Sequence, residues 1–447
     1  MPSVYIETYG CQMNVADSEL IRGHLARSGY TAVADPAAAD VILLNTCAIR
    51  EHAEERIFRR VGALAHHRAG KPHLQIGVAG CMAQHLKDRL LERLDFVVGP
   101  DGYRRLPEML GGDPFADVRL DRDETYADLA PQRAAGVRAW ITVMRGCDKF
   151  CTFCIVPYVR GRERSVPLDA VLAQVCDAAA AGHREVVFLG QTVNAYRSGD
   201  DDFGALLRRA AAIPGVARVR FTSPHPSDMT DSAIEALRSC PAVCPHVHLP
   251  VQSGSDAVLA RMERGYSVAE YTDLAARVRA AVPGAALSSD FIVGFPGESE
   301  ADFADSVELM RRMRYDFAFL FKYSRRDHTK AAKWDETVSE VEKQRRLQVL
   351  IDLQESIAAE INAGWVGREV EVLVEGPARR PEGWLAGKTR EFKTAVFPAG
   401  DAQAGDLVRV RITDATSHTL MGTPLSVVRD VSASFAADPA SPSESPL

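Results

Sequence analysis

Three cysteines stand close together at positions 147, 151 and 154, in the segment MRGCDKFCTFCIVP. This C-x3-C-x2-C spacing lets three thiolates converge on one iron–sulfur cluster, and the missing fourth thiolate leaves one iron open for a ligand from outside the protein. The spacing differs from those of ferredoxins and zinc ribbons. Because free cysteines are usually scattered, three incidental buried cysteines are a poor explanation. The sequence therefore predicts that Cys147, Cys151 and Cys154 hold a cluster.

Cys11, Cys47 and Cys81 form a second set, although 36 and 34 residues separate them. Each lies one or two positions after the end of an expected strand. These strands are expected at 4–9, 41–46 and 74–79. Since the carboxyl ends of parallel strands meet along one edge of a sheet, we expect the three cysteines to be neighbours in space. A second three-thiolate cluster site is the favoured interpretation, and buried structural cysteines are the alternative.

The other three cysteines, Cys176, Cys240 and Cys244, give weaker signals. Cys176 falls in an alanine-rich helical stretch, where a small buried hydrophobic role is favoured. Cys240 and Cys244 precede His246 and His248, a combination that could bind zinc, but prolines interrupt the segment and the histidines alternate along a strand. A metal is therefore not favoured there.

An α/β architecture must position these cysteines. Each of the first three strands is followed by a helical stretch, expected at 16–28, 49–67 and 82–93, which predicts a parallel βα domain. Residues 99–137 are rich in Asp, Gly, Pro and Ala and are expected to form a linker with one helical turn. We place the first domain boundary near residue 135.

The same alternation returns in the central part of the chain. Strands are expected near 139–145, 185–190, 217–222, 246–250, 287–293 and 315–323. Helical stretches are expected at 168–181, 203–212, 230–239, 255–262, 268–281 and 299–313, and one long amphipathic helix at 336–363. Six βα units fit a partial or complete parallel barrel.

Beyond Gly364 the pattern becomes all-β, with short strands separated by turn residues, as in a small barrel or sandwich. The last residues are rich in Ser, Pro and Ala and are expected to be disordered. The predicted domains are thus 1–135, 136–363 and 364–430, with a tail at 431–447.

Composition excludes several classes of protein. The 447 residues are 46% hydrophobic and 25% charged, which is typical of a folded globular protein and excludes wholesale disorder. No apolar run approaches the roughly 18 residues of a membrane span. The start MPSVYIETYGCQMN does not resemble an export signal, so we expect a cytoplasmic protein without a membrane partner. The net charge of −7 means that a nucleic acid would need a local basic patch.

Such a patch is present at 379–393, although residues 364–427 as a whole carry eight basic and eight acidic groups. The patch contains Arg379, Arg380, Trp384, Lys388, Arg390 and Lys393, with Phe392 among them. Basic groups can bind phosphates while aromatic faces stack on bases, which predicts an RNA-binding surface. An ordinary charged β-hairpin is the alternative.

Several longer motifs carry a resemblance to a known family. They are GCQMN at 10–14, NTCAIRE at 45–51, GCMAQ at 80–84, RGCDKFCTFCIVPYVRGRERS at 145–165, LGQTVNAY at 189–196, TSPHP at 222–226, HLPVQSGS at 248–255 and DFIVGFPGE at 290–298. Together they resemble the radical S-adenosylmethionine (SAM) methylthiotransferases over essentially residues 3–425. That family combines an amino-terminal cluster domain, a partial radical SAM barrel and a carboxy-terminal RNA-binding TRAM domain.

The resemblance implies two [4Fe–4S] clusters and SAM as cofactors. Cys147, Cys151 and Cys154 would hold the cluster that binds SAM and supports its reductive cleavage to a 5′-deoxyadenosyl radical. Cys11, Cys47 and Cys81 would hold an auxiliary cluster that carries the sulfur. The implied reaction adds a methylthio group at C2 of N6-(dimethylallyl)adenosine 37 in tRNA. The electron donor and the sulfur donor are not identified, and a monomer is expected.

Candidate SAM contacts lie at the predicted strand ends. Gly294, Pro296 and Gly297 form a turn in GFPGE, where backbone amides can approach a ligand. Gln191, Asn194 and Asp290 are further candidates, and His225, Gln252 and Ser253 are weaker ones. Arg160 and Arg162 could bind the SAM carboxylate or an RNA phosphate.

Two positions depart from the family pattern. The segment YSRRDHTKAA at 323–332 lacks two prolines and a glycine that the family usually has, and Val166 replaces a usual Arg. Neither change affects a proposed cluster ligand.

Alternative functions are methylthiolation of threonylcarbamoyl-adenosine or of a ribosomal-protein aspartate, or a non-catalytic iron–sulfur electron carrier or RNA-binding sensor.

Overall fold

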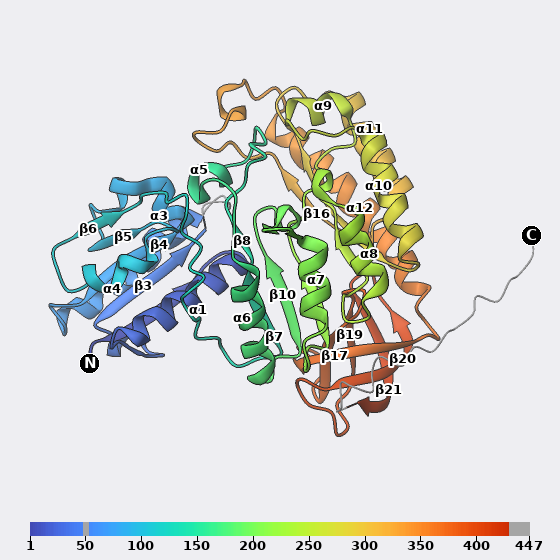
Figure 1. Ribbon diagram of the computed structural model, residues 1–447. Coiled ribbons are helices and arrows are strands. Elements are labelled where there is room, and N and C mark those ends of the chain that lie inside the picture. Colours follow the sequence, from blue (N-terminus) through green and yellow to red (C-terminus); the bar gives the residue numbers. More distant parts are fainter. Residues whose placement is uncertain (48–52, 429–447) are drawn as a thin grey trace, which may run out of the picture.

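The computed structural model describes residues 1–47 and 53–428, which form three units that follow one another along the chain (Figure 1). An amino-terminal sheet domain lies beside a central half-open barrel, and a small closed barrel lies at the lower end of the central strands. The predicted α/β class with a terminal small β-barrel is confirmed. Within the described residues, no helix is both long enough and apolar enough to cross a membrane.

The amino-terminal unit is a six-stranded parallel sheet in the order β2-β1-β3-β4-β5-β6. Its strands are β1 (Ser3–Thr8), β2 (Thr31–Ala32), β3 (Val41–Thr46), β4 (Gln75–Gly80), β5 (Phe96–Val98) and β6 (Phe115–Asp117). Its helices are α1 (Gln12–Arg27), α2 (Ala53–Ala65), α3 (Cys81–Leu86) and α4 (Leu106–Met109). Strand β3 is buried along its whole length, as a central parallel strand must be.

Three sequence expectations for this unit need correction or a limit. Residues 99–137 contain the edge strand β6 as well as α4, because a three-residue strand is too short to show a period. The helix expected at 82–93 ends at Leu86 and continues as a 3-10 turn over Lys87–Leu90. The first residues of the helix expected at 49–67 lie outside the described residues. The tail expected at 431–447 lies outside them entirely.

The central unit has six parallel strands in two groups of three, β13-β10-β7 and β14-β15-β16. The strands are β7 (Arg138–Thr142), β10 (Glu185–Leu189), β13 (Arg218–Phe221), β14 (His246–His248), β15 (Ala286–Val293) and β16 (Phe317–Lys322). A parallel bridge from Val219 to Val243 connects the two groups. The result is the predicted partial barrel.

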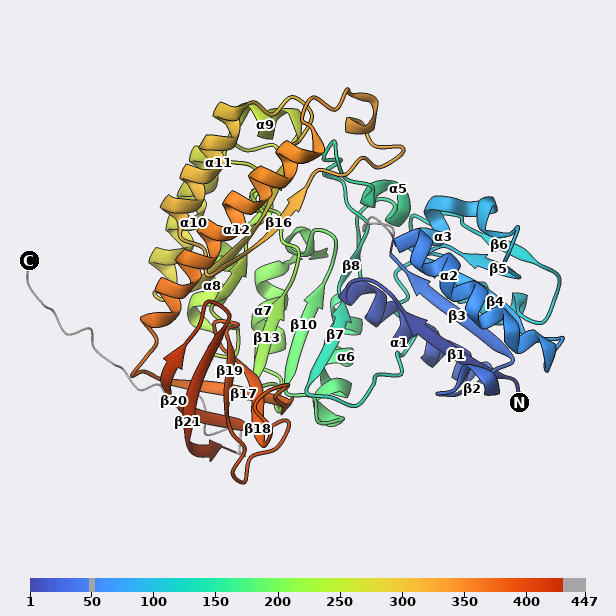
Figure 2. The ribbon, with the colours of Figure 1, turned by 180° about the vertical axis from the view of Figure 1, so that it is seen from behind.

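Helices cover the outer face of this barrel, as the view from behind also shows (Figure 2). They are α6 (Leu168–Ala180), α7 (Phe203–Ala211), α8 (Asp231–Ser239), α9 (Asp256–Arg261), α10 (Val268–Ala281), α11 (Glu300–Met313) and α12 (Glu340–Ala363). Alternate strand residues such as Ile141, Phe188 and Val219 point outward into the core beneath these helices. The short helix α5 (Val156–Arg160) lies instead beside α3 of the amino-terminal unit. Helix α12 starts four residues after its expected start because Ser339 caps it by accepting the N–H of Glu342.

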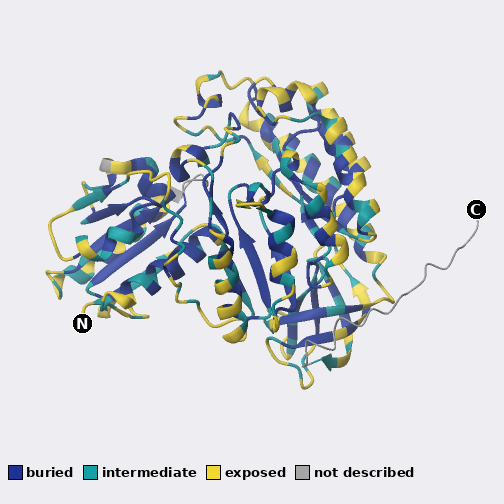
Figure 3. Cartoon of the chain, in the orientation of Figure 1, coloured by how far each residue is buried: buried dark blue, intermediate teal, exposed yellow. Residues whose placement is uncertain are grey.

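The inner face of the first strands packs against the amino-terminal unit. Met13 and Ala16 of α1 form a small buried cluster with Val187 and Leu189 of β10, which Trp140 of β7 joins. In Figure 3, strand β10 is coloured as buried along its length, and most of helix α1 is also coloured as buried. Helix α1, which begins immediately after Cys11, is therefore held against the barrel.

The carboxy-terminal unit is a closed barrel in the order β17-β18-β19-β21-β20. Its strands are β17 (Glu369–Pro377), β18 (Trp384–Thr389), β19 (Thr394–Pro398), β20 (Leu407–Ala415) and β21 (Thr419–Val428). It contacts the amino-terminal ends of the central strands, where Arg218 donates to the carbonyl of Lys388 at 2.6 Å and Arg138 pairs with Glu375 at 2.6 Å. The unit thus lies at the end of the central barrel opposite to the strand ends that precede the cysteines (Figure 1).

Candidate cluster and cofactor site

The segment with Cys147, Cys151 and Cys154 runs from the short strand β8 (Met144–Arg145) to helix α5, and it is fixed at several points. Gly146 has φ +77°, and a Cβ there would lie 1.9 Å from the carbonyl oxygen of Arg162, so only glycine fits. The backbone N–H of Thr152 donates to the carbonyl of Met262 at 3.0 Å, and the carbonyl of Thr152 accepts the N–H of Ala331 at 2.8 Å. These bonds tie the loop to the barrel and to the atypical segment 323–332.

The three thiols of this loop influence one another electrostatically. Burial raises the pKa of Cys154 to about 12, and burial also raises the pKa of Cys147. Negative charge on Cys151 adds to both shifts. Thiols in this state become thiolates when a metal cation stabilises them, as a coordinating metal does. The donor set therefore fits an iron–sulfur cluster.

Cys11, Cys47 and Cys81 converge from three strand ends of the amino-terminal sheet. Cys11 caps helix α1, Cys47 follows β3, and Cys81 starts α3. A hydrogen bond with Cys47 lowers the pKa of Cys11 to about 6, whereas burial raises the pKa of Cys81. A Cβ on Gly10 would lie 2.7 Å from the Cβ of Cys47, so the glycine permits this close approach.

No three Cys, His, Asp or Glu side chains meet as a preformed metal site within residues 1–47 and 53–428. The fit to clusters rests instead on two features. Thiols within each triplet lie close enough in pairs to shift one another's pKa. Burial raises the pKa of Cys81, Cys147 and Cys154, so a cation would be needed to hold them as thiolates.

A buried ionic network joins the two cysteine regions. Asp17 of α1 accepts hydrogen bonds from Arg160 at 2.7 Å and from Arg145 at 2.9 Å, and all three side chains are almost fully buried. Burial acts to raise the pKa of Asp17, but Arg160 and Arg145 together lower it. Arg160 also lies with Nε 3.1 Å from the sulfur of Cys81. It therefore contacts the second triplet although it stands six residues after Cys154.

Gln191 and Asn194 brace the loops around the first triplet. The side-chain oxygen of Gln191 accepts the N–H of Gly146 at 2.6 Å. Asn194 forms two hydrogen bonds of 2.8 Å with the backbone of His225. Burial lowers the pKa of His225 to about 2, so this imidazole is neutral.

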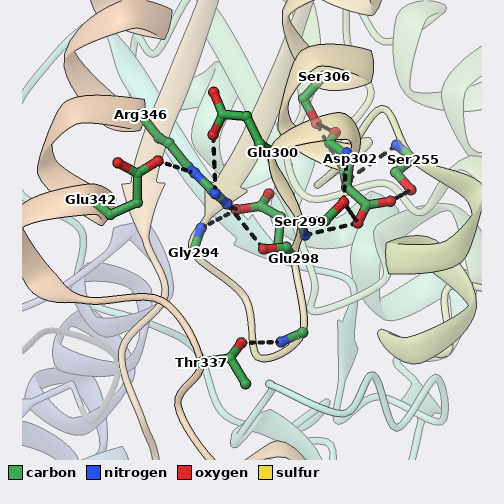
Figure 4. Close-up of polar contacts among 12 residues, drawn as sticks. Ser255, Gly294, Glu298, Ser299, Glu300, Asp302, Ser306, Thr337, Glu342 and Arg346 are labelled. Carbon is green, nitrogen blue, oxygen red and sulfur yellow. Dashed lines mark hydrogen bonds and ion pairs between the residues drawn. The ribbon is translucent and has the colours of Figure 1, made fainter.

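The GFPGE turn is occupied by bonds within the protein (Figure 4). Gly294 donates its N–H to Glu298 at 2.5 Å, and Gly297 donates to Thr337 at 2.8 Å. Glu298 in turn accepts a bond of 2.8 Å from Arg346 of α12. The two amides that were expected to approach a ligand thus stabilise the turn itself. Of the other candidates, the carbonyl of Pro296 accepts from Arg261 at 3.1 Å. Oδ1 of Asp290 lies 3.3 Å from Nε2 of His248 but has no hydrogen-bond partner among the described residues.

Comparisons with known proteins agree with these units. Residues 3–99 match Uncharacterized protein family UPF0004, residues 141–310 match the Radical SAM superfamily, and residues 365–425 match the TRAM domain. A tRNA-2-methylthio-N(6)-dimethylallyladenosine synthase of Chlorobium luteolum is 44% identical over 436 residues, covering 95% of this chain and 98% of the relative. A synthase of the same name from Anaeromyxobacter sp. (strain K) is 47% identical and covers 94% of both chains.

The chain belongs to the tRNA-2-methylthio-N(6)-dimethylallyladenosine synthase family. It is an enzyme of the radical SAM transferase type, and that type implies SAM and a [4Fe–4S] cluster. Among solved structures, the radical SAM methyltransferase TsrM of Kitasatospora setae superposes with a TM-score of 0.56 at 13% identity, covering 74% of this chain and 77% of that one. The cobalamin-dependent enzyme OxsB gives 0.54 at 14% identity, covering 80% and 56%. At these identities the likeness concerns the fold alone.

In this member of the synthase family, the predicted RNA-binding residues divide into two groups. Arg379 and Arg380 are exposed, and Trp384 is partly exposed. Lys388, Arg390 and Lys393 instead face the central unit. Burial lowers the pKa of Lys388, Arg390 donates to the carbonyl of Pro241, and Lys393 pairs with Asp316 at 2.8 Å. The side chains of Arg390 and Lys393 dock the TRAM domain, because their partners lie on the central unit. The side chain of Lys388 donates to Thr394 within the TRAM domain at 2.8 Å, and its backbone carbonyl accepts from Arg218 of the barrel.

Sequence reasoning about this synthase missed two residues near the cysteine triplets. Arg264 is buried, with Nη1 3.3 Å from the sulfur of Cys151. Asp17, the residue that links the domains, was also not singled out. Neither stands in a motif of its own, and charged residues are ordinarily solvated. Arg162, a sequence candidate for anion binding, is exposed and paired with Asp148 at 2.6 Å.

Proposed function

We propose that the chain inserts a methylthio group at C2 of N6-(dimethylallyl)adenosine 37 of tRNA, using SAM and two [4Fe–4S] clusters. The observation that carries this proposal is the presence of two cysteine triplets on either side of one buried contact between domains. Arg160 follows the first triplet and contacts the second, with its Nε 3.1 Å from Cys81. A reaction that both activates a C–H bond and donates sulfur needs two open sites close to one substrate position.

Cys147, Cys151 and Cys154 are the proposed ligands of the SAM-binding cluster, and Cys11, Cys47 and Cys81 those of the auxiliary cluster. When bound, these groups supply the radical and the sulfur. The protein holds the two loops in a fixed relation through Asp17, Arg145 and Arg160, whose side chains are nearly inaccessible to solvent. This burial excludes water from the contact between the loops.

The SAM site is proposed at the carboxyl ends of the central strands, bordered by Gln191, Asn194, Asp290 and the turn that contains Gly294, Pro296 and Gly297. Gln191 and Asn194 act there by holding Gly146 and His225 in place. The turn contributes to the shape of this proposed site and donates no amide to it, since the N–H groups of Gly294 and Gly297 are already bonded to Glu298 and Thr337.

The proposed tRNA surface includes Arg379, Arg380 and Trp384 on the TRAM domain. Two exposed guanidinium groups can bind phosphates, and an indole can stack on an unpaired base. Arg390 and Lys393 support this surface by attaching the domain to the central unit through their side chains, and Lys388 does so through its backbone carbonyl. We propose that the enzyme works as a cytoplasmic monomer and that donors outside the chain supply its electrons and its sulfur.

Iron analysis after anaerobic reconstitution tests the proposal. Wild type should bind about eight irons, and the Cys147/Cys151/Cys154 and Cys11/Cys47/Cys81 triple alanine variants about four each. Cys176→Ala is the matched control, because Cys176 is exposed and outside both triplets. Only the first triple variant should lose SAM cleavage, and both should lose methylthiolation of tRNA carrying the dimethylallyl group. Four irons in wild type would contradict the two-cluster proposal, and product only with threonylcarbamoyl-adenosine tRNA or a ribosomal protein would contradict the substrate.

A further inference from the structure

Each cysteine triplet is contacted by one buried arginine. The Nε of Arg160 lies 3.1 Å from the sulfur of Cys81, and the Nη1 of Arg264 lies 3.3 Å from the sulfur of Cys151. The two arginines are 2% and 6% exposed. Arginine is rarely this buried unless its charge is paired, so each contact needs an electrostatic explanation.

Arg160 belongs to a network with one more positive than negative charge. Asp17 is shared between Arg160 and Arg145, while neighbouring Arg164 is paired with Asp101. The single carboxylate of Asp17 is thus the acidic partner of both the Arg160 and the Arg145 guanidinium groups. A thiolate at Cys81 would supply the missing negative charge, and the N–H of Arg160 is already placed to donate to it.

Arg264 is held by neutral groups instead. Its Nη2 donates to the carbonyl of Pro250 at 2.8 Å, and its Nε donates to the hydroxyl of Tyr266 at 2.9 Å. In the part of the chain that the structure describes, no carboxylate forms an ion pair with this guanidinium. A thiolate at Cys151 would therefore be its anionic partner.

We propose that Arg160 and Arg264 are positioning residues that donate to one thiolate ligand of each cluster, and that each arginine raises the reduction potential of its own cluster. The inference rests on the proposed function, because it takes both triplets as cluster ligands. A reduced cluster carries one more negative charge than the oxidised one, so a nearby cation and N–H donor stabilise the reduced form. Hydrogen bonds to cluster sulfurs are among the factors that set such potentials.

Redox titration followed by electron paramagnetic resonance tests the two contacts separately. The full-length chain with Cys147, Cys151 and Cys154 changed to Ala retains only the auxiliary cluster, and the Cys11/Cys47/Cys81 triple alanine variant retains only the SAM-binding cluster. Arg160→Gln should shift the potential in the first background to a more negative value. Arg264→Gln should do so in the second. The two crossed combinations are matched controls and should leave the potential unchanged.

The lysine variants separate charge from hydrogen bonding. Arg160→Lys and Arg264→Lys keep the positive charge, so their shifts should be smaller than those of the glutamine variants. If a glutamine variant does not retain iron, the potential is measured on the corresponding lysine variant instead. Arg160→Gln should still fold, since Asp17 keeps its bond to Arg145 at 2.9 Å.

The outcomes are distinguishable from failure of the proposed function. Iron missing from one of the two triple backgrounds, before any arginine is changed, would refute the second cluster itself. Clusters present with unchanged potentials in all four arginine variants would overturn the inference. Equal shifts in matched and crossed combinations would also overturn it, because they would indicate a general opening of the fold.

Discussion

The Nζ of Lys393 lies 2.8 Å from the Oδ1 of Asp316, and this ion pair fastens the TRAM domain to the central barrel. Lys393 also donates to the side-chain oxygen of Asn362, near the end of α12, at 2.8 Å. Nearby, the ring of Phe392 stacks on that of His246 at 5.0 Å. The hairpin from Lys388 to Lys393 is therefore part of the junction between domains.

Lys393→Ala should lower the free energy of unfolding by about 3 kcal/mol, because breaking a buried pair leaves the remaining charge without a partner. The two side chains are only 7% and 14% exposed. Urea unfolding of the full chain measures the change. Arg411→Ala is the control, since its pair with Glu369 is largely exposed and should contribute less than about 1 kcal/mol. Equal effects of the two substitutions would contradict the docking role.

The double substitution of Arg379 and Arg380 by Ala should weaken tRNA binding and reduce its dependence on salt. Each lost phosphate contact lowers the slope of log affinity against log salt by roughly 0.7 to 0.9. Filter binding at several salt concentrations measures both quantities. A double substitution of Arg409 and Arg411, which are exposed on β20, makes the same change in charge. If this control weakens binding as strongly, the effect comes from net charge and not from a local site.

The convergence of Cys11, Cys47 and Cys81 could be predicted because it depends only on topology. Strands β1, β3 and β4 are parallel neighbours, so residues that follow them must share one edge. The central barrel followed from the regular βα alternation in the same way. Short elements such as β6 were missed, since three residues carry no period.

The direction of charged side chains could not be predicted. Lys388, Arg390 and Lys393 look like an RNA-binding patch in sequence. In the structure, the side chains of Arg390 and Lys393 contact Pro241 and Asp316 of the central unit. Arg218 and Arg220 of β13 donate to the backbone carbonyls of Lys388 and Arg390, so this hairpin forms a domain junction. Arg160 likewise looks like an anion ligand, and its partner Asp17 lies 143 residues away. Such pairings depend on how whole domains dock, and a local motif contains no information about docking.

Glu185 should make stability depend on pH in the acid range. Its side chain is fully buried, with Oε1 lying 2.5 Å from Nε of Arg138 and Oε2 lying 2.6 Å from Nε of Arg220. Burial acts to raise its pKa, but Arg220 and Arg138 lower it from 4.5 to about 2. A carboxylate with a lowered pKa stabilises the fold above its unfolded pKa, and this contribution is lost as the pH falls through the lower folded value.

The contribution of Glu185 should therefore be complete above pH 4.5 and fall by on the order of 3 kcal/mol as the pH approaches 2. Unfolding measured from pH 7 to pH 2 should show the difference between wild type and Glu185→Gln shrinking over this window. Glu369→Gln removes one negative charge at an exposed position and serves as the control. A difference that stays constant with pH would contradict the assignment.

Gly294→Ala should destabilise the turn that borders the proposed SAM site. Gly294 has φ +71°, and a Cβ there would lie 2.3 Å from Cγ of Lys343. Lys343 cannot move aside easily, because its buried Nζ is bonded to Glu336 at 2.6 Å and to Glu340 at 2.8 Å. The positive φ should cost about 1 to 2 kcal/mol, and the overlap a further 1 to 3 kcal/mol, roughly.

Gly284→Ala separates the two costs. Gly284 has a similar φ of +79°, but a Cβ there would meet no atom within 4 Å. Its substitution should therefore show the backbone cost alone, in the same unfolding assay. We also expect SAM affinity to fall only for Gly294→Ala, since that turn lies beside the proposed site. Equal losses of stability would mean that Lys343 yields to the added methyl group, and unchanged SAM affinity would mean that the turn does not shape the site.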